Sequence, residues 1–534
     1  MRIRVGRMAT ITAEPPRVRA ELDVDGRRLA ATAAPVTPAR PVPTGAVYEA
    51  YTLDRYHRSI HALVALKWRY AAWIVTLTAL TVALFSGVRT PASELGQYFQ
   101  YLTLVWLLPI PLLIWVTIVY FAWFREAKFR IEPPAEVPPP AERPTVQFQV
   151  TSTGVNVETV LTTIRSVLYW TGQHPEVGYR TEIWATIEEF GYRPNQERFD
   201  ALAREGVHVV VVPMGYRPPN GTTRKGRALQ YAVEQRRALG PALARTWIYH
   251  QDDETAVGED TVLGIDEFVR RHGDEKALGL GIILYPQDAD FRPSQIQEFG
   301  RTKDDLRTVY TITSPRNKMS GFHGSHYVVR ADVEDATGWD VGPNMLSEDL
   351  IFENAVRREH GAIFHILKGF AYEKAAFSLA DQLRQRRRWV QGFARAIRRE
   401  RFSWGRRAVM AYSMGVWLGA FMSLGAIATS WIFGFTPLLP FAGGCAGFVW
   451  VSMISGYHKG YILHREYLPP RSTPLWRVVV NGVVGALTDG AAPWYGLLSR
   501  RTRGFEVIQK DRSTAPIRTP ARGVAGVDRM TLNR

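Results

Sequence analysis

The amino-acid sequence predicts an α/β domain with a mainly parallel sheet, inserted between membrane-spanning helices. Long stretches without a charged side chain lie on both sides of residues 129–400. Between them, strand-like and helical patterns alternate, which is typical of a parallel sheet with helices on both faces. The chain has 534 residues, enough for more than one domain, and its 46% apolar residues exclude disorder throughout.

Two membrane-spanning helices are expected before the soluble part, within residues 46–128. Residues 70–88 and 95–124 contain no Asp, Glu, Lys or Arg, and a bilayer core needs ~20 apolar residues per helix. Residues 1–45 are rich in Pro, Ala, Arg and Thr and lack apolar periodicity. We therefore expect these residues to form a disordered arm in the cytosol.

Two more spans are expected in residues 408–464, where the charge-free window is divided by the turn-like residues 434–437 (GFTP). Cys445, in the second of these spans, is the only cysteine of the chain. A single cysteine excludes an intramolecular disulfide and a cysteine-cluster zinc site.

The last apolar stretch, residues 478–499, contains groups that are costly in lipid unless they face protein or a cavity. These groups are Asn481, Asp489, Gly490 and Pro493. We expect residues 465–512 to hold a broken, re-entrant or amphipathic element with a basic end, and residues 513–534 to be a disordered tail.

Basic residues cluster beside the apolar stretches, and the positive-inside rule places such clusters in the cytosol. They fall at residues 55–69, 125–130, 384–407 and 499–503. Four full spans satisfy this arrangement, so we expect a multi-pass protein of the plasma membrane with a cytoplasmic soluble part. Membrane topology explains most of the net charge of +16, and it disfavours nucleic-acid binding.

The soluble part is expected to begin after a proline-rich linker with four strands and the helices between them. The strands are predicted at residues 146–151, 181–187, 207–212 and 246–251, and the helices at residues 157–170, 198–205 and 226–239. Ligands of such sheets bind outside the carboxyl ends of the strands. The residues that follow each strand are therefore the candidates for chemistry.

Three acidic residues, Asp252, Asp253 and Glu254, follow the fourth predicted strand. In an extended chain, alternation places Asp252 and Glu254 on one side, where two carboxylates can share Mg²⁺ or Mn²⁺. An acidic cap of the next helix is an equally good interpretation of these residues alone.

Lys225 precedes the helix predicted at residues 226–239, with Arg224 and Arg227 beside it. A helix amino terminus with flanking cations suits an anionic group. Taken alone, this segment is also explained by a solvated basic turn.

Glu348 and Asp349 begin an amphipathic helix that is expected to continue to Arg358. Acidic residues in a first helical turn ordinarily complement the helix dipole. The functional alternative is a general base that removes a proton from an incoming hydroxyl.

A helix rich in Arg and Trp is expected at residues 377–398, just before the third span. It contains the sequence QRRRW, from Gln385 to Trp389. Its composition fits an interfacial helix, for which lipid anchoring alone is the simpler role.

The order of these motifs resembles the membrane-integrated inverting glycosyltransferases of family 2, which include cellulose, hyaluronan, chitin and ceramide-sugar synthases. Within that family, the likeness is greatest to the egghead-type, GDP-mannose-dependent β-1,4-mannosyltransferases of glycosphingolipid synthesis. It spans roughly residues 146–392. The matching stretches are TRKGRALQY (223–231), WIYHQDDET (247–255), GSHYVV (324–329) and YEKAAFSLADQLRQRRRWVQG (372–392).

The resemblance implies a GT-A fold for residues 129–376, followed by interfacial helices with the Gln-x-x-Arg-Trp motif (QxxRW) in residues 377–407. It implies transfer of one mannose from GDP-mannose, in β-1,4 linkage, onto a glucosyl lipid at the cytosolic membrane face. The implied partners are the nucleotide sugar, the lipid-linked acceptor and membrane lipids, and we expect a monomer.

Two alternatives belong to other functional classes. A processive synthase would build a long β-glycan from a UDP-sugar, but four spans are few for a polysaccharide channel. A transporter is disfavoured, because the charged residues lie in the soluble part and not in the apolar stretches.

Carried over position by position, the resemblance assigns a role to each motif. Asp252 and Glu254 would hold Mg²⁺ or Mn²⁺, as the family's DxD motif does, and Asp349 would be the catalytic base. The residues assigned to the nucleotide sugar are Thr151, Glu188, Lys225, Asp252, Asp253, Arg388 and Trp389. The residues assigned to the acceptor are His323, Gly324, Ser325, Glu348, Asp349, Gln385 and Trp389.

The sequence departs from the family pattern at two places. The acidic triplet ends in Glu254 where the family has Asp, which leaves the metal geometry less defined. The first strand ends in Thr151 and the residues STG, without the acidic residue that many relatives place near uracil. This departure favours guanine as the base of the nucleotide.

Overall fold

A computed structural model of the chain describes residues 46–499, apart from 88–92, 95–97, 99, 135, 240–244, 287–292, 313–321, 344, 362, 399–401, 434–441 and 469–474. All of them belong to the unit Val36–Arg534. The expected disordered ends (1–45 and 513–534), the turn at 434–437 and the basic residues 500–503 lie outside the described residues.

The described part of the chain contains one eight-stranded sheet, in the order β3-β2-β1-β4-β7-β6-β8-β5. The strands are β1 (Thr145–Ser152), β2 (Arg180–Glu188), β3 (His208–Val212), β4 (Thr246–Asp252), β5 (Ala256–Val257), β6 (Ala277–Leu284), β7 (Tyr327–Arg330) and β8 (Ile363–Tyr372). Antiparallel pairing reverses only β7 and β5 among these eight strands. The predicted α/β GT-A fold with a mainly parallel sheet is thus confirmed.

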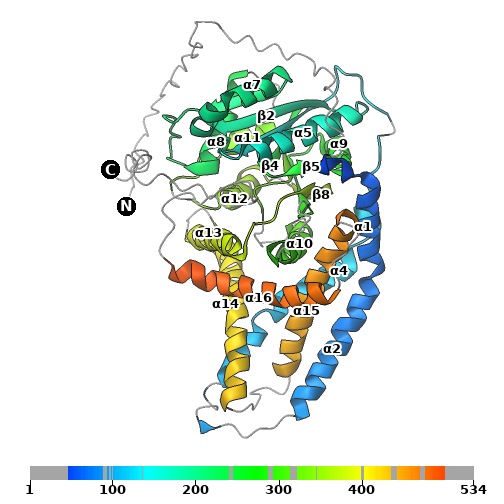
Figure 1. Ribbon diagram of the computed structural model, residues 1–534, viewed down its shortest axis with the longest axis vertical. Helices are drawn as coiled ribbons and strands as arrows, with labels where there is room; N and C mark the ends of the chain where they lie inside the picture. The colour runs from blue at the N-terminus through cyan, green and yellow to red at the C-terminus, as the bar shows by residue number, and fades with distance from the viewer. Residues whose placement is uncertain are drawn as a thin grey trace, which may run out of the picture. The chain divides into compact units, whose positions relative to one another are not determined.

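Helices cover the sheet between the strands, as Figure 1 shows. Those of the soluble part are α5 (Val157–Gln173), α6 (Glu189–Tyr192), α7 (Gln196–Arg204), α8 (Arg224–Leu239), α9 (Glu259–His272), α10 (Pro293–Ile312), α11 (Ala331–Thr337), α12 (Glu348–His360) and α13 (Leu379–Ile397). The four predicted strands and the predicted helices are all present, with bounds shifted by a few residues.

The core explains why these segments are strands. All eight residues of β1 are buried, as expected of a central strand that is covered on both faces. Its apolar side chains alternate, and Phe148 packs edge-on against Tyr249 of β4 at 5.4 Å between ring centroids. Burial on both faces therefore fixes the register in which β1 and β4 pair.

The register brings the carboxyl ends of the central strands to one edge of the sheet. Thr151 near the end of β1 lies opposite Asp252 at the end of β4, and Glu188 ends the neighbouring β2. Because β7 runs antiparallel to β4, the turn before Tyr327 reaches the same edge. This edge is where the candidate residues meet.

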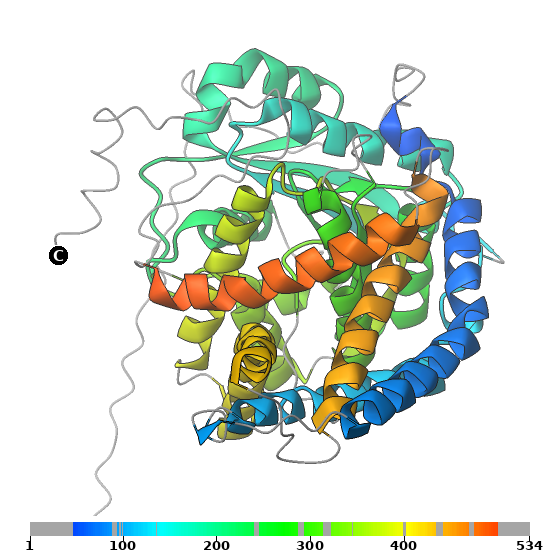
Figure 2. The same ribbon diagram turned by 60° about the horizontal axis from the view of Figure 1, so that its bottom comes forward.

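The apolar segments outside the soluble part are helical. They comprise α1 (Leu53–Ala65), α2 (Lys67–Gly87), η2 (Gln100–Leu107), α4 (Ile110–Trp123), α14 (Trp404–Phe433), α15 (Ala442–His464) and α16 (Leu475–Leu498). Among the described residues, Leu53–Ala83 and Tyr101–Ala122 are long and apolar enough to cross a membrane. In both views α15 lies beside α2 (Figures 1 and 2), and the two helices are in contact.

The break expected within residues 478–499 is absent, because α16 is a single helix that contains Pro493. A proline has no N–H to donate to the carbonyl four residues earlier, and here that carbonyl belongs to Asp489. The indole Nε1 of Trp417 donates to this oxygen at 2.7 Å. The Asp489 carboxylate in turn accepts a bond from Arg386 at 3.2 Å. Neighbouring helices thus satisfy the polar groups that were expected to interrupt the helix.

Candidate active site

Lys225 joins two of the predicted site segments. Its ammonium group forms an ion pair with the carboxylate of Asp252 and donates to the carbonyl oxygen of Gly324 at 2.5 Å. Burial alone would lower the pKa of Lys225, but the neighbouring carboxylates, Asp252 foremost, outweigh it and raise that pKa. Lys225 therefore remains a cation between the end of β4 and the turn before β7.

Asp349 lies on the other side of the same turn. A Cβ atom built on Gly324 would be 3.2 Å from the Lys225 Nζ and 3.4 Å from the Asp349 Oδ2. The Lys225 ammonium group and the Asp349 carboxylate therefore both lie next to Gly324, in the space that a side chain at this position would occupy. The amino termini of α8 and α12 also meet, since a Cβ on Gly226 would lie 3.5 Å from the Glu348 Cβ.

The carboxyl group of Asp349 is held in place and has an unusual proton affinity. Its Oδ1 accepts a bond from the Leu350 backbone N–H at 2.8 Å. Burial and the adjacent Glu348 carboxylate raise the pKa of Asp349 to about 7, against the opposing effect of Lys225. A carboxyl with this pKa can accept a proton near neutral pH and release it again.

The acidic triplet is arranged differently from simple alternation along a strand. Asp253 accepts a bond from the Ser152 hydroxyl at 2.7 Å. Burial and the carboxylate of Glu254, with which it is hydrogen-bonded, raise the pKa of Asp253 well above its usual range. Two carboxyl groups in contact need a proton or a cation between them, and carboxylate oxygens are ligands that Mg²⁺ and Mn²⁺ prefer. The triplet therefore fits a divalent ion.

The turn before β7 supports the end of β4. The Asp252 backbone N–H donates to the Ser325 hydroxyl at 3.2 Å, and that hydroxyl lies 2.7 Å from the Thr255 hydroxyl. His323 faces backbone carbonyls with both ring nitrogens, at 2.5 Å from Ser325 and 3.2 Å from Gly281. These contacts give Ser325 and His323 supporting positions around the site.

The remaining strand-end residues lie at the same sheet edge. Glu188 forms an ion pair with Arg227 of α8, and both side chains are nearly buried. Burial raises the pKa of Glu188, against the effect of Arg227. Thr151 is buried, and its hydroxyl has no hydrogen-bond partner in the part of the chain that the structure describes. Thr151 therefore offers a polar group to a ligand at this edge.

Comparison with known proteins finds a family likeness that includes Asp252, the turn before β7, Asp349 and α13. Residues 247–454 match the model of the family described as glycosyl transferase family group 2. The chain is 30% identical to β-1,4-mannosyltransferase bre-3 of Caenorhabditis briggsae over 40% of its own length and 46% of that protein's. Residues 247–454 are thus similar to a family 2 glycosyltransferase domain.

Two further relatives are similar over a longer part. β-1,4-Mannosyltransferase bre-3 of Caenorhabditis elegans is 28% identical over 58% of this chain and 68% of that protein. β-1,4-Mannosyltransferase egh of Drosophila melanogaster is 26% identical over 57% of this chain and 67% of that protein. The resemblance to family 2 and to egghead-type enzymes is thereby confirmed.

The helix with the QxxRW motif, α13, packs against the segment that leads into Asp349. A Cβ on Gly392 would collide with the Ser347 Oγ and lie 3.1 Å from the carbonyl carbon of Leu346, so α13 approaches this segment closely only because residue 392 is glycine. Gln385 accepts a bond from Arg386 at 3.1 Å. Arg388 is half-buried on the same helix. The motif helix and the candidate base therefore belong to one packed unit.

The sequence did not reveal Arg301, which the fold places beside Trp389. The Arg301 guanidinium of α10 lies 4.9 Å from the Trp389 ring centroid and 5.2 Å from that of Tyr285, after β6. Arg386 contacts the same Trp389 ring at 4.3 Å. Nothing in the spacing of Arg301 from the motif could have shown this contact, because it depends on how α10 crosses α13.

Tyr327, the first residue of β7, is a second residue that sequence analysis missed. Its side chain is fully buried, and its hydroxyl makes no hydrogen bond within the described residues. Burial is the main cause of its raised pKa, and the carboxylates of Asp349 and Asp252 contribute to it. The Tyr327 hydroxyl thus lies within the electrostatic reach of the site.

Proposed function

We propose that this chain transfers a single mannose from GDP-mannose, in β-1,4 linkage, onto a glucosyl lipid at the cytosolic face of a membrane. The observation that carries the proposal is the convergence of Asp252, Lys225 and Asp349 around Gly324. In this arrangement Lys225 would be the cation that binds a diphosphate, and Asp349 would be the base that acts on an alcohol, at the same edge of the sheet. The choice of mannose rests on the three similar β-1,4-mannosyltransferases.

The residues that would hold a divalent ion are Asp252 and Glu254, with Asp253 beside them. When bound, Mg²⁺ or Mn²⁺ would offset the charge that develops on the leaving diphosphate. Lys225 would share that task from α8, with Arg388 as a second cation from α13. In this arrangement Thr151 and Glu188 face the nucleoside end of the donor.

Asp349 would act on the acceptor. Its carboxylate takes the proton of the attacking sugar hydroxyl while that oxygen bonds to the anomeric carbon and the bond to the nucleotide breaks. Attack from the face opposite the leaving group inverts the anomeric centre, so an α-linked donor gives a β-linked product. Glu348, Gln385 and Trp389 would line the acceptor side.

The helices that flank the domain support the proposed placement at a membrane. The apolar side chains of Val75 and Leu80 in α2 and of Ile118 in α4 are exposed in the protein alone, as expected of surfaces that face lipid. An acceptor with a lipid tail would be presented to α13 from this side. We further propose that the protein spans the membrane several times, with the site in the cytoplasm.

A donor screen tests the proposal. Detergent-solubilised enzyme is incubated with a glucosyl lipid and GDP-mannose, GDP-glucose, UDP-glucose or UDP-N-acetylglucosamine, and the release of nucleotide is measured with and without the lipid. Lipid-dependent release from GDP-mannose alone is expected. Release only from a UDP-sugar would overturn the mannosyl assignment and leave the glycosyltransferase domain intact.

The length of the product separates the proposal from a processive synthase. Radiolabelled product from the same reaction is expected to carry one added sugar per lipid. A ladder of many sugars would favour the synthase.

A further inference from the structure

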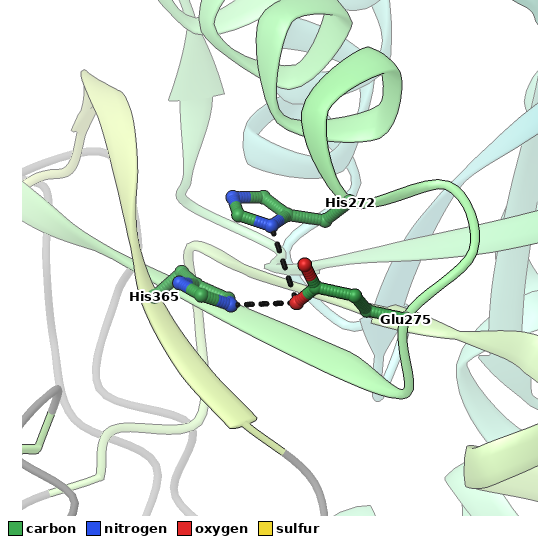
Figure 3. Close-up of side chains that lie close together, drawn as sticks. All are labelled: His272, Glu275 and His365. Carbon is green, nitrogen blue, oxygen red and sulfur yellow. Dashed lines mark hydrogen bonds and ion pairs between the residues drawn. The ribbon is translucent and has the colours of Figure 1, made fainter.

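Two histidines and a glutamate meet at a place that the transfer reaction does not use. His272 ends α9, Glu275 lies in the turn that follows, and His365 lies near the start of β8 (Figure 3). The Glu275 Oε2 is 3.0 Å from the His365 Nε2 and 3.4 Å from the His272 Nδ1. The three ligand atoms all lie within 4.8 Å of one another, the one such group among the described residues.

This cluster lies at the sheet edge opposite the candidate active site. His365 pairs in register with Gly279, near the amino end of β6. Since β6 and β4 both run antiparallel to β7, the amino end of β6 lies away from the carboxyl end of β4. The cluster is therefore separate from Asp252 and Asp349, and none of its members has a role in the proposed transfer.

We propose that His272, Glu275 and His365 form a binding site for a divalent transition-metal ion, with Zn²⁺ as the preferred ion. Two imidazole nitrogens and one carboxylate oxygen are a common zinc ligand set. With metal–ligand bonds of about 2.1 Å, two ligand atoms of a tetrahedral ion lie ~3.4 Å apart. The Glu275 Oε2 lies 3.0 Å from the His365 Nε2 and 3.4 Å from the His272 Nδ1, and both distances are close to this value.

The surroundings of His272 support the binding of an ion at its Nδ1. Its Nδ1 is buried, and apart from the long 3.4 Å approach to the Glu275 Oε2 it makes no hydrogen bond in the described part of the chain, which is uncommon for a buried ring nitrogen. The two imidazole rings stack at 3.8 Å with 20° between their planes. Small rotations about the Cβ–Cγ bonds, which are soft in histidine, turn both nitrogens toward one ion.

The cluster is also open enough for an ion to enter and retain water. The side chains of His272, Glu275 and His365 are 18%, 42% and 28% exposed. Three protein ligands and an accessible fourth position suit a zinc ion with one bound water. A site between α9 and β8 would tie the helix end to the strand, so its main effect would be on stability.

Zinc binding to tag-free, detergent-solubilised protein tests the proposal. Bound Zn²⁺ is measured by mass spectrometry of metals after dialysis against excess Mg²⁺, which occupies the oxygen-ligand site. About one Zn²⁺ per chain and a raised melting temperature are expected for the native protein. His365→Ala and Glu275→Gln should each abolish both effects.

The matched control is His61→Ala. His61 also lies 3.0 Å from a glutamate, Glu126, but among the described residues the two do not belong to a group of three possible ligands within 4.8 Å of one another. This variant should bind zinc as the native protein does. No zinc in the native protein, or the same stoichiometry in His365→Ala and Glu275→Gln as in the native protein, would overturn the proposal. Neither result would bear on mannosyl transfer, which is measured separately.

Discussion

Lys225 and Asp252 form an ion pair that joins the start of α8 to the end of β4. The pair lies next to Gly324, whose missing side chain leaves room for both Lys225 and Asp349. Three segments that are far apart in the sequence thus bring a cation and two carboxylates together. Each of the following predictions tests a part of this arrangement.

Asp252→Asn should weaken the metal-dependent binding of GDP-mannose. The substitution keeps the shape of the side chain but removes the charge that holds both the ion and Lys225. A charge-assisted contact contributes about 1.5–3 kcal/mol, which corresponds to a dissociation constant ~10–100-fold higher. Isothermal titration calorimetry in the presence of Mn²⁺ measures the dissociation constant of GDP-mannose for the native protein and the variant. Asp332→Asn, at a partly buried ion pair with Arg330, is the control, and equal affinities in the two variants would contradict the assignment.

Gly324→Ala should reduce transfer without unfolding the protein. The added methyl group would lie 3.2 Å from the Lys225 Nζ, so that the ammonium group must shift slightly, and it would touch the Asp349 Oδ2 at 3.4 Å. Since a misplacement of about 1 Å can lower a rate by about 100-fold, we expect this smaller shift to lower the rate of transfer by roughly 3- to 10-fold. The control is Gly172→Ala in α5, where a Cβ meets nothing within 4 Å. If Gly324→Ala were as active as Gly172→Ala, the turn would not belong to the site.

The rate of transfer should depend on pH through Asp349. Because the pKa of Asp349 is raised to about 7, the base is ionised above that pH and protonated below it. We expect kcat/KM to level off above about pH 7 and to fall ~10-fold per pH unit below it. A pH–rate profile measures this directly. A profile that stays flat down to about pH 5, as for an ordinary carboxyl, would argue against Asp349 as the base.

Arg386→Met should destabilise the protein much more than Arg384→Met. Arg386 is buried between Glu298 at 3.3 Å and Asp489 at 3.2 Å, and its removal would take a cation away from the buried carboxylate of Glu298 and the partly buried one of Asp489. The expected cost is about 3–5 kcal/mol. Arg384 is half exposed and pairs with Asp381, so its loss should cost less than about 1 kcal/mol. Thermal unfolding in detergent compares the two, and similar melting temperatures would show that the buried network contributes little.

The sequence predicted the first half of the sheet well, because β1 to β4 and the helices between them follow local patterns. The apolar runs of buried parallel strands and the acidic triplet after β4 are visible without any tertiary information. Asp349 could be recognised as a candidate base from a local pattern as well, because it lies in the first turn of a predicted amphipathic helix. What local pattern could not give was the ion pair of Lys225 with Asp252, which depends on the strand order.

The features that the sequence did not predict arise from contacts between distant elements. Residues 478–499 were expected to be broken, re-entrant or amphipathic. The break is absent because Trp417 and Arg386 satisfy polar groups of α16 from other helices. Arg301 reaches Trp389 because α10 and α13 cross. The contact of Asp253 with Glu254 differs from the alternation that an ideal strand would give, because β4 ends at Asp252.

The most direct measurement is a comparison of donor binding and transfer in Asp349→Asn. This variant keeps the size of the side chain and the hydrogen bond from Leu350, but it cannot accept the proton of the acceptor hydroxyl. Affinity for GDP-mannose should be unchanged within about a factor of two, whereas transfer to the glucosyl lipid should fall by ~10²–10⁴-fold. Full transfer activity in Asp349→Asn would contradict the proposed active site.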